Sequence, residues 1–262
     1  MHTYAADKPE DSQVATFRKR LLAGEPLIGT WLKTPHPVIV EVLALAGVDV
    51  ICVDAEHAPF GRAEIDACVM AARLMDLPTV VRVPAADPHL TLAALDMGAT
   101  GVVVPHIRTA AEAEAVVKSC RYGPGGRGYA GSTRAAGYAT RPMKDVIASG
   151  NNDVVVMAQL EDADALDNLP GLMGVDGIDA YFIGPADLSV SMGINDTWAP
   201  QVTQAISTIA AAGRAHDKRL ATFLANTQAV PKWRAEGISM FWIASDHAFL
   251  MQGAKDMMKV KG

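Results

Sequence analysis

Four apolar runs in the sequence end in polar residues that could take part in catalysis. The residues at these run ends are Asp54, His57, Arg82, Gln159, Glu161 and Asp187. Together they supply carboxylates, an imidazole and a guanidinium, which can bind a cation, carry a proton and stabilise an oxyanion. Each residue alone is weak evidence for catalysis. The hypothesis of an active site therefore rests on the fact that all of them lie at the ends of apolar runs.

Glu161 and Asp187 are the candidate metal ligands. They end two successive strand-like runs, and neighbouring strands lie about 4.8 Å apart, so both side chains could reach one cation. Carboxylates with no nearby Cys or His suit a hard ion such as Mg²⁺ or Mn²⁺, with water or substrate filling the other positions. The alternative role is helix capping, because each residue precedes a helical stretch. The residues alone leave both roles open.

Arg82 and His57 each have a catalytic and a structural interpretation. Arg82 ends a run that should be buried, where an unpaired charge is costly. It is therefore either a donor to a substrate oxyanion or a salt-bridge partner of a carboxylate such as Asp54. His57 is either a core or capping histidine or, beside Asp54 and Glu56, a general base.

Short apolar runs alternate with helical patterns along the whole chain and must position these residues. The strand-like runs are Leu27–Trp31, Val48–Val53, Thr79–Val83, Gly101–Val104, Val154–Leu160, Ala180–Ile183, Leu220–Leu224 and Met240–Ala244. The helix-length patterns include Pro37–Ala46, Arg62–Met75, Pro88–Met97, Ala110–Cys120, Pro200–Ala215, Thr227–Glu236 and Asp246–Lys259. Such short, continuously apolar runs are typical of parallel strands buried on both faces.

The number of runs and the chain length favour an α/β fold of the (β/α)₈ TIM-barrel type over an open doubly wound sheet. No Gly-x-Gly-x-x-Gly follows the first run, which weakens the dinucleotide-binding alternative. The 262 residues contain no linker or shift in composition, so we expect one domain. In a barrel of this type the active site lies at the carboxyl ends of the strands, where the polar residues above would meet.

Composition restricts the partners and the location. Lys and Arg number 23 against 29 Asp and Glu, for a net charge of −6, which argues against nucleic-acid and anionic-membrane partners. The 3 cysteines form no Cys-x-x-Cys pair, so neither a disulfide framework nor a zinc ribbon is indicated. Residues 1–20 are polar and lack an apolar signal core, and no apolar stretch reaches membrane-spanning length. We expect a cytoplasmic protein in which residues 1–20 form a peripheral segment.

The segment Tyr122–Tyr138 interrupts the alternation of runs and helices, and it is rich in glycine. Arg121, Arg127 and Arg134 lie in or beside it. Its alternatives are an anion-binding nest, a loop that closes over substrate, and a plain connection on the face opposite the active site. Because the segment follows a helix rather than a strand, we assign none of its residues to the chemistry.

At the run ends the chain resembles the metal-dependent (class II) pyruvate aldolases of the HpcH/HpaI family. The resemblance extends from about Gly29 to Met251. It rests on Gly-Thr-Trp at 29–31, VDAEHAP at 53–59, VVRV at 80–83, Gln-Leu-Glu at 159–161, FIGPADLS at 182–189 and Leu-Ala-Asn at 224–226. The resemblance implies an aldolase that joins the enolate of pyruvate or hydroxypyruvate to an aldehyde and cleaves 4-hydroxy-2-oxo acids in reverse.

The resemblance also implies a role for each site residue. Glu161 and Asp187 would hold Mg²⁺, Mn²⁺ or Co²⁺, Arg82 would stabilise the enolate, and His57 would act as the base. Asp96 would raise the basicity of His57, although our own interpretation of the sequence puts Asp96 on a helix away from the run ends; Asp54 is the alternative helper. The residues that would form the pyruvate pocket are Trp31, Gln159, Gly184, Pro185, Ala186 and Asp187.

The departures from the family pattern leave the acceptor aldehyde open. They are Lys33-Thr34-Pro35-His36 after the first run, a Gly-Gly-Arg-Gly form of the glycine-rich segment, and Phe241-Trp242. Lys33 is also the only candidate for Schiff-base chemistry, because no other run is followed by a lysine. The competing functions are a barrel lyase acting on a CoA thioester, for which we find no basic phosphate cluster beyond the glycine-rich segment, and a non-catalytic scaffold.

The closing segment, residues 246–262, predicts an amphipathic helix. Apolar residues recur at helical spacing, and four of the chain's 12 methionines lie between Met240 and Met258. Such a stripe either packs on the chain's own barrel or, as the resemblance implies, is exchanged between the subunits of a hexamer. We expect a homo-oligomer, most simply a homohexamer.

Overall fold

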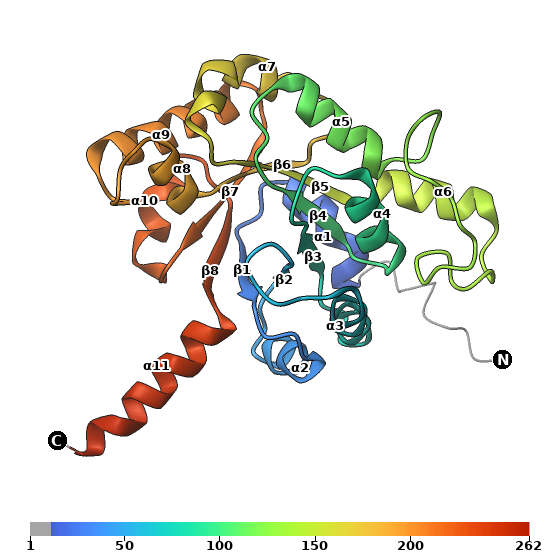
Figure 1. Cartoon of the computed structure of the whole chain (residues 1–262), viewed down its shortest axis with the longest axis horizontal. Coiled ribbons are helices and arrows are strands. Elements are labelled where there is room, and N and C mark those ends of the chain that lie inside the picture. Colours follow the sequence, from blue (N-terminus) through green and yellow to red (C-terminus); the bar gives the residue numbers. More distant parts are fainter. Residues whose placement is uncertain (1–11, 262) are drawn as a thin grey trace.

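The computed structural model describes residues 12–261 and shows a closed barrel of eight parallel strands (Figure 1). The strands are β1 (Leu27–Leu32), β2 (Val50–Asp54), β3 (Thr79–Arg82), β4 (Gly101–Val104), β5 (Val155–Leu160), β6 (Ala180–Ile183), β7 (Arg219–Leu224) and β8 (Met240–Ser245). Each strand pairs with the next, and β8 pairs with β1. The predicted TIM barrel and single domain are confirmed, and the strand-like runs coincide with these strands to within two residues.

Most of the helices lie around the outside of the barrel (Figure 1). The α-helices are α1 (Gln13–Leu22), α2 (Pro37–Leu45), α3 (Arg62–Leu74), α4 (Pro88–Asp96), α5 (Ala110–Cys120), α6 (Met143–Asn152), α7 (Leu169–Met173), α8 (Pro185–Ser191), α9 (Pro200–Ala215), α10 (Val230–Ala235) and α11 (Asp246–Met258). Short 3₁₀ segments are η1 (Ala163–Asn168), η2 (Thr227–Ala229) and η3 (Lys259–Lys261). Several helices start at side-chain caps that the sequence contains, among them Asp87 before α4 and a Thr109–Glu112 capping box at α5.

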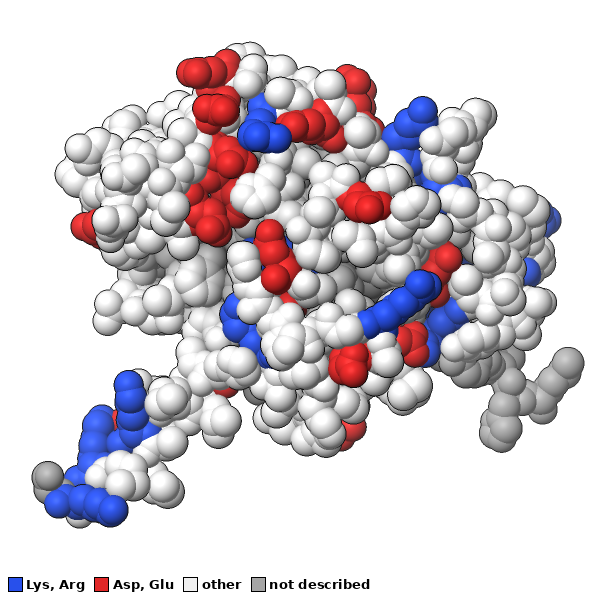
Figure 2. Space-filling view, viewed as in Figure 1, with Lys and Arg blue, Asp and Glu red and all other residues white. Residues whose placement is uncertain are grey.

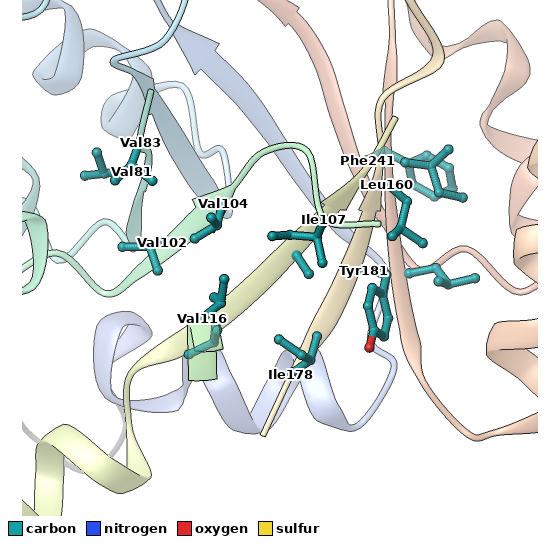
Figure 3. Packing of buried hydrophobic residues seen from close by; sticks show 14 of the residues in the cluster. Val81, Val83, Val102, Val104, Ile107, Val116, Leu160, Ile178, Tyr181 and Phe241 are labelled. Carbon is teal, nitrogen blue, oxygen red and sulfur yellow. The ribbon is translucent and has the colours of Figure 1, made fainter. Parts of the chain in front are cut away.

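The strands are continuously apolar because both of their faces are buried. In β2, Val50 and Cys52 belong to the cluster that fills the barrel, whereas Ile51 and Val53 belong to the cluster between the strands and the helices. Figure 3 shows part of this outer cluster, in which side chains from several strands and from the helix layer meet. Inside the barrel the packing is close enough that a Cβ on Gly29 would lie 2.6 Å from the ring of Trp242.

Helix α1 corrects the prediction that residues 1–20 form a peripheral segment. Residues 1–11 lie outside the described part of the chain. From Gln13 onward the segment is helical, and Phe17 and Leu21 are both fully buried in the cluster that fills the barrel. Spaced four apart, these two side chains lie on one face of the helix and cover the interior of the barrel. The prediction was wrong because the contact with the barrel is made by only two large apolar residues, which are inconspicuous in an otherwise polar segment.

Helix α11 projects away from the barrel (Figure 1). The only residue of this helix that is buried is Asp246, in its first turn. Its large apolar side chains Phe249, Leu250, Met251, Met257 and Met258 are all exposed. Packing of this helix on its own barrel, one of the two alternatives from the sequence, is therefore wrong for the single chain.

The surface shows no extended basic area on the barrel in the view of Figure 2, where Lys and Arg are scattered among Asp and Glu and gather mainly on the projecting α11. No helix within residues 12–261 is long and apolar enough to cross a membrane.

Candidate active site

A cavity of about 190 Å³ opens at the carboxyl ends of the strands. The predicted site residues that line it are Trp31, His57, Arg82, Gln159, Gly184, Pro185, Ala186 and Asp187. Asp54 and Glu161 are buried next to these residues, at 0% and 2% exposure. The barrel thus brings together residues that are up to 156 positions apart in the chain, from Trp31 to Asp187 (187 − 31).

Arg82 is held in place by Asp54. The two residues are direct partners in the register of β2 and β3, and Arg82 donates from Nε (3.0 Å) and Nη2 (2.8 Å) to Oδ1 of Asp54. The guanidinium also lies 4.2 Å from the centre of the Trp31 ring. Within the described chain no acceptor is recorded for Nη1, so this nitrogen is available to a ligand. The salt bridge and the role as an oxyanion donor are therefore compatible.

Lys33 is a second cation on the same carboxylate. Its Nζ lies 2.5 Å from Oδ2 of Asp54. Burial opposes ionisation of Asp54, but Arg82 and Lys33 outweigh it and hold the pKa of Asp54 below its usual value. Because the ion pair requires the ammonium form of Lys33, this contact argues against Schiff-base chemistry, which needs a neutral amine.

The ring of His57 contacts Glu56 rather than Asp54. Asp54 Oδ1 accepts the backbone N–H of His57 at 3.1 Å, whereas the imidazole Nε2 lies 3.7 Å from Oε2 of Glu56. Glu56 is also 3.2 Å from Nε of Arg82. Burial raises the pKa of Glu56, and Arg82 and His57 oppose that rise. The His57 side chain is about half exposed (53%), so a proton can move between its ring and a bound ligand or solvent.

Glu161 is a buried carboxylate that two donors hold. Its Oε1 accepts the backbone N–H of His106 at 3.0 Å, and its Oε2 accepts the side-chain amide of Gln159. Burial and, to a smaller extent, the nearby Asp187 carboxylate raise the pKa of Glu161 to about 7, against the opposing effect of His106 and Gln159. A Cβ on Gly184 would lie 2.9 Å from Oε2 of Glu161, so only glycine allows this close approach of the backbone.

The donor set fits a hard divalent cation with few protein ligands. Within residues 12–261 no cluster of three or more His, Cys, Asp or Glu is arranged as a complete metal site. Two carboxylates are sufficient for Mg²⁺, which keeps several waters when it binds. Gln159 Oε1 is buried without a hydrogen-bond partner in the described structure, and such a water could donate to it. Glu161 and the nearby Asp187 are therefore the two carboxylates that could hold such an ion.

Asp96 does not join these residues. It is the last residue of α4, at the opposite end of the barrel from the strand carboxyl ends, and its Oδ1 accepts from Arg127 Nη2 at 2.7 Å. In the single chain Asp96 therefore neither contacts nor orients His57, in agreement with its helical placement from the sequence and not with the role implied by the resemblance. Asp54 touches only the backbone of His57, so the carboxylate at the ring is Glu56.

Three further residues at the site are His106, Phe182 and Phe223, to which the sequence analysis assigned no role. His106 follows β4 and has a left-handed backbone (φ 58°), which directs its N–H to Glu161; its ring lies 3.0 Å from Asp162. Two phenylalanines, Phe182 and Phe223, line the cavity. The rule of searching strand ends applies to His106 as well, because it stands two residues beyond β4. Phe223 lies within an apolar run, in which the sequence does not show which residues face the interior of the barrel.

The fold and the site define a single-domain TIM-barrel protein with acidic, basic and imidazole groups around one small cavity. A model of the HpcH/HpaI aldolase/citrate lyase family matches residues 27–252. The chain is 31% identical to a hydroxypyruvate/pyruvate aldolase of Roseovarius nubinhibens, over 93% of this chain and 95% of that protein. It is 39% identical to a 4-hydroxy-2-oxovalerate aldolase of Rhodococcus jostii, over 78% and 81% of the two chains.

A solved structure of an HpcH/HpaI aldolase/citrate lyase family protein from Burkholderia cenocepacia superposes with a TM-score of 0.89 at 33% identity, covering 94% of this chain and 99% of that one. The chain therefore belongs to the HpcH/HpaI aldolase/citrate lyase family. The named relatives are enzymes that act on carbon–carbon bonds, which supports the lyase function over the scaffold and CoA-thioester alternatives.

Proposed function

We propose that the protein is a divalent-metal-dependent aldolase that joins a 2-oxo acid, such as pyruvate or hydroxypyruvate, to an aldehyde and cleaves the resulting 4-hydroxy-2-oxo acid. One observation supports the proposal: Asp187 lines the same cavity as Arg82, and the Glu161 carboxylate is buried close to Asp187, so a cation held by these two carboxylates would face an oxyanion donor. This pairing suits a reaction in which charge develops on an oxygen next to a carboxylate.

Glu161 and Asp187 are the residues that would hold Mg²⁺, Mn²⁺ or Co²⁺. When bound, the ion would act as a Lewis acid that favours loss of a proton from carbon 3 of the 2-oxo acid. Gln159 fixes one oxygen of Glu161 and the His106 amide fixes the other. These donors leave the carboxylate little freedom to rotate, as expected for a preformed site.

Arg82 stabilises the enolate oxygen in this proposal. Asp54 and the Trp31 ring hold its guanidinium, and Nη1 has no acceptor among residues 12–261, so it could donate to the ligand. A donor that is fixed before the reaction needs no reorganisation when charge develops.

His57 is the residue that we assign to proton transfer at carbon 3 and at the hydroxyl group of the aldol. It lines the cavity, and Glu56 lies beside its ring. Trp31, Phe182, Phe223 and Pro185 supply the apolar part of the wall, which limits the access of water to a carbanion-like intermediate.

Metal removal tests the proposal. The protein is stripped with EDTA, and both cleavage of a 4-hydroxy-2-oxo acid and solvent exchange of the pyruvate C3 protons are followed by NMR. We expect both activities to disappear and to return with Mg²⁺, Mn²⁺ or Co²⁺. Glu161→Ala and Asp187→Ala should stay folded and remain inactive with added metal. Full activity after verified removal of all metal would refute the mechanism.

We further propose that the protein assembles as a homohexamer in which α11 packs against a neighbouring subunit. The exposed apolar side chains of α11 support a second copy of the chain as the partner, since a lone helix with such a surface is unfavourable in water. The exchange of a terminal helix between subunits is the arrangement that the family resemblance implies.

A further inference from the structure

Glu56 is a buried carboxylate next to the active site, and one of its oxygens accepts no hydrogen bond. The residue stands in the loop after β2, and its side chain is 10% exposed. Its Oε2 is closed to solvent and has no hydrogen-bond donor within residues 12–261. Buried polar atoms are nearly always hydrogen-bonded in folded proteins, so an acceptor without a donor at an active site calls for a functional explanation.

Three nitrogen-bearing side chains face Glu56. Nε of Arg82, at the end of β3, lies 3.2 Å from Oε2, and Nε2 of His57 lies 3.7 Å from the same oxygen. Nε2 of His106, which follows β4, lies 3.9 Å from the other oxygen, Oε1. Asp54, at the end of β2, is the nearby negative charge. Glu56 is thus surrounded mainly by groups that donate hydrogen bonds.

Of these groups, only His57 has a ring N–H that is available to Oε2. The single hydrogen on Nε of Arg82 is donated to Oδ1 of Asp54 at 3.0 Å. The His106 ring faces Oε1, and its Nδ1 lies 3.0 Å from Asp162. The His57 ring makes no hydrogen bond with residues 12–261, and it is half exposed, so it has room to turn toward the carboxylate. Hydrogen bonds at catalytic sites are often long before the substrate binds and shorten in the complex.

We propose that Glu56 is a positioning residue for His57, in which Oε2 accepts the Nε2–H of the ring and leaves Nδ1 as the nitrogen that exchanges protons with the substrate. The proposal rests on the assignment of His57 to proton transfer under the proposed function. The backbone of His57 is held as well, because its N–H donates to Oδ1 of Asp54 at 3.1 Å. A neutral imidazole that donates from one nitrogen to a carboxylate keeps a single tautomer, and its other nitrogen stays unprotonated.

The proposed orientation defines the path of the proton. In the cleavage direction, Nδ1 of His57 takes the proton of the 4-hydroxyl group while the bond between carbons 3 and 4 breaks. The electron pair of that bond passes to the enolate of the 2-oxo acid, and the former hydroxyl carbon leaves as the aldehyde. Nδ1 then gives the same proton to carbon 3, so the ring ends as it began. Nε2 keeps its hydrogen throughout, and the Glu56 carboxylate stabilises the imidazolium between the two transfers.

NMR of the full-length protein labelled with ¹⁵N-histidine tests the orientation without turnover. At alkaline pH, where imidazoles are neutral, we expect a protected proton on Nε2 of His57 and an unprotonated Nδ1. Loss of the signals in His57→Asn identifies them. Glu56→Gln keeps an acceptor oxygen and should retain the protected proton, whereas Glu56→Leu should lose it to exchange with solvent. A proton on Nδ1, or a protected Nε2 proton that persists in Glu56→Leu, would overturn the proposal.

A double-mutant cycle on solvent exchange of the pyruvate C3 protons separates positioning from a structural role. Glu56→Leu should lower the exchange rate at least about tenfold, typical of residues that orient a functional group. In the His57→Ala background the same substitution should change the rate less than about twofold, because Glu56 acts through the ring. Glu114→Gln, which alters an exposed glutamate on α5, should exchange like the unmodified protein.

The cycle and the NMR spectra together decide the proposal. An equal loss from Glu56→Leu in both backgrounds would show that Glu56 serves Arg82 or the fold, and it would overturn the proposal. Glu56→Gln provides the same comparison if the leucine variant fails to fold, and its smaller loss should likewise require His57. If the unmodified protein exchanges no pyruvate protons, the proposed aldolase function fails, whereas the NMR spectra still decide whether Glu56 holds the His57 ring.

Discussion

At the scale of single residues, the site depends on how two cations share two carboxylates. Arg82 contacts both Asp54 and Glu56. Without a second cation, the negative charge of these two carboxylates would exceed the positive charge of Arg82. Lys33 offsets Asp54 and leaves Arg82 with charge to offer a substrate oxyanion. The sequence alone could predict Arg82, His57 and Asp54, because they stand where apolar runs end. It could not predict the Lys33–Asp54 contact, which depends on the reach of a long side chain from a different strand.

Arg82 and His57 should each be needed for catalysis, but for different physical reasons. We expect Arg82→Ala to lose about 10²–10³ in both aldol cleavage and pyruvate proton exchange, since it removes a preorganised oxyanion donor. His57→Ala should lose about 10²–10⁴ in turnover, typical of general acid–base catalysis, while it still binds metal. Stopped-flow and NMR exchange rates on both variants measure these losses. Unchanged rates in His57→Ala across the pH range would assign the base elsewhere, with Glu56 the next candidate.

Lys33→Met tests the charge balance. The variant should lower proton exchange roughly tenfold, equivalent to about 1.4 kcal/mol on the barrier. Lys33 helps to hold the pKa of Asp54 low, so its removal raises that pKa and Asp54 becomes protonated at a higher pH. The acid limb of the rate profile should therefore move to higher pH, and Lys33→Arg should restore it. A rate loss with an unshifted profile, not rescued by arginine, would show that Lys33 serves packing alone.

At the scale of elements, the strands were predictable and α1 was not. A strand that is buried on both faces, such as β2, is apolar at every position and is therefore visible in the sequence. Helix α1 buries only Phe17 and Leu21. These two side chains stabilise the fold only because they cover the end of a barrel that is formed by other parts of the chain, so the sequence of α1 alone does not reveal the contact. Asp96 shows the same limit: its place at the end of α4 was predictable, but its partner Arg127 lies 31 residues further on.

Phe17→Ala tests the importance of α1 for the barrel. The side chain is fully buried, so its truncation should lower the free energy of unfolding by about 3–5 kcal/mol. Leu22→Ala in the same helix removes a side chain that is 38% exposed and should change it by no more than about 0.5 kcal/mol. Urea unfolding at a fixed protein concentration gives both values. Equal effects of the two substitutions would show that α1 is not part of the core.

At the scale of the whole molecule, α11 should determine the assembly. Truncation after His247 removes the exposed apolar residues but keeps Asp246 and the barrel. We expect the full-length protein to be a hexamer and the truncated chain to be smaller, measured by light scattering. A mass near the 27.7 kDa of one chain for the full-length protein at micromolar concentration would refute the oligomer. A truncated chain that remains hexameric would refute the role of the helix.

The first residue of that same helix also reaches the catalytic end of the barrel. Asp246 accepts the backbone N–H of Lys33 (2.9 Å) and of Thr34 (2.8 Å), so the helix that leaves the barrel starts on the loop that carries a site residue. In the proposed hexamer, a rotation of α11 on loss of the neighbouring subunit would be transmitted through these two hydrogen bonds to Lys33 and Thr34. If the subunits separate on dilution, each separated chain would have a lower catalytic efficiency. The specific activity would therefore rise with enzyme concentration until assembly is complete.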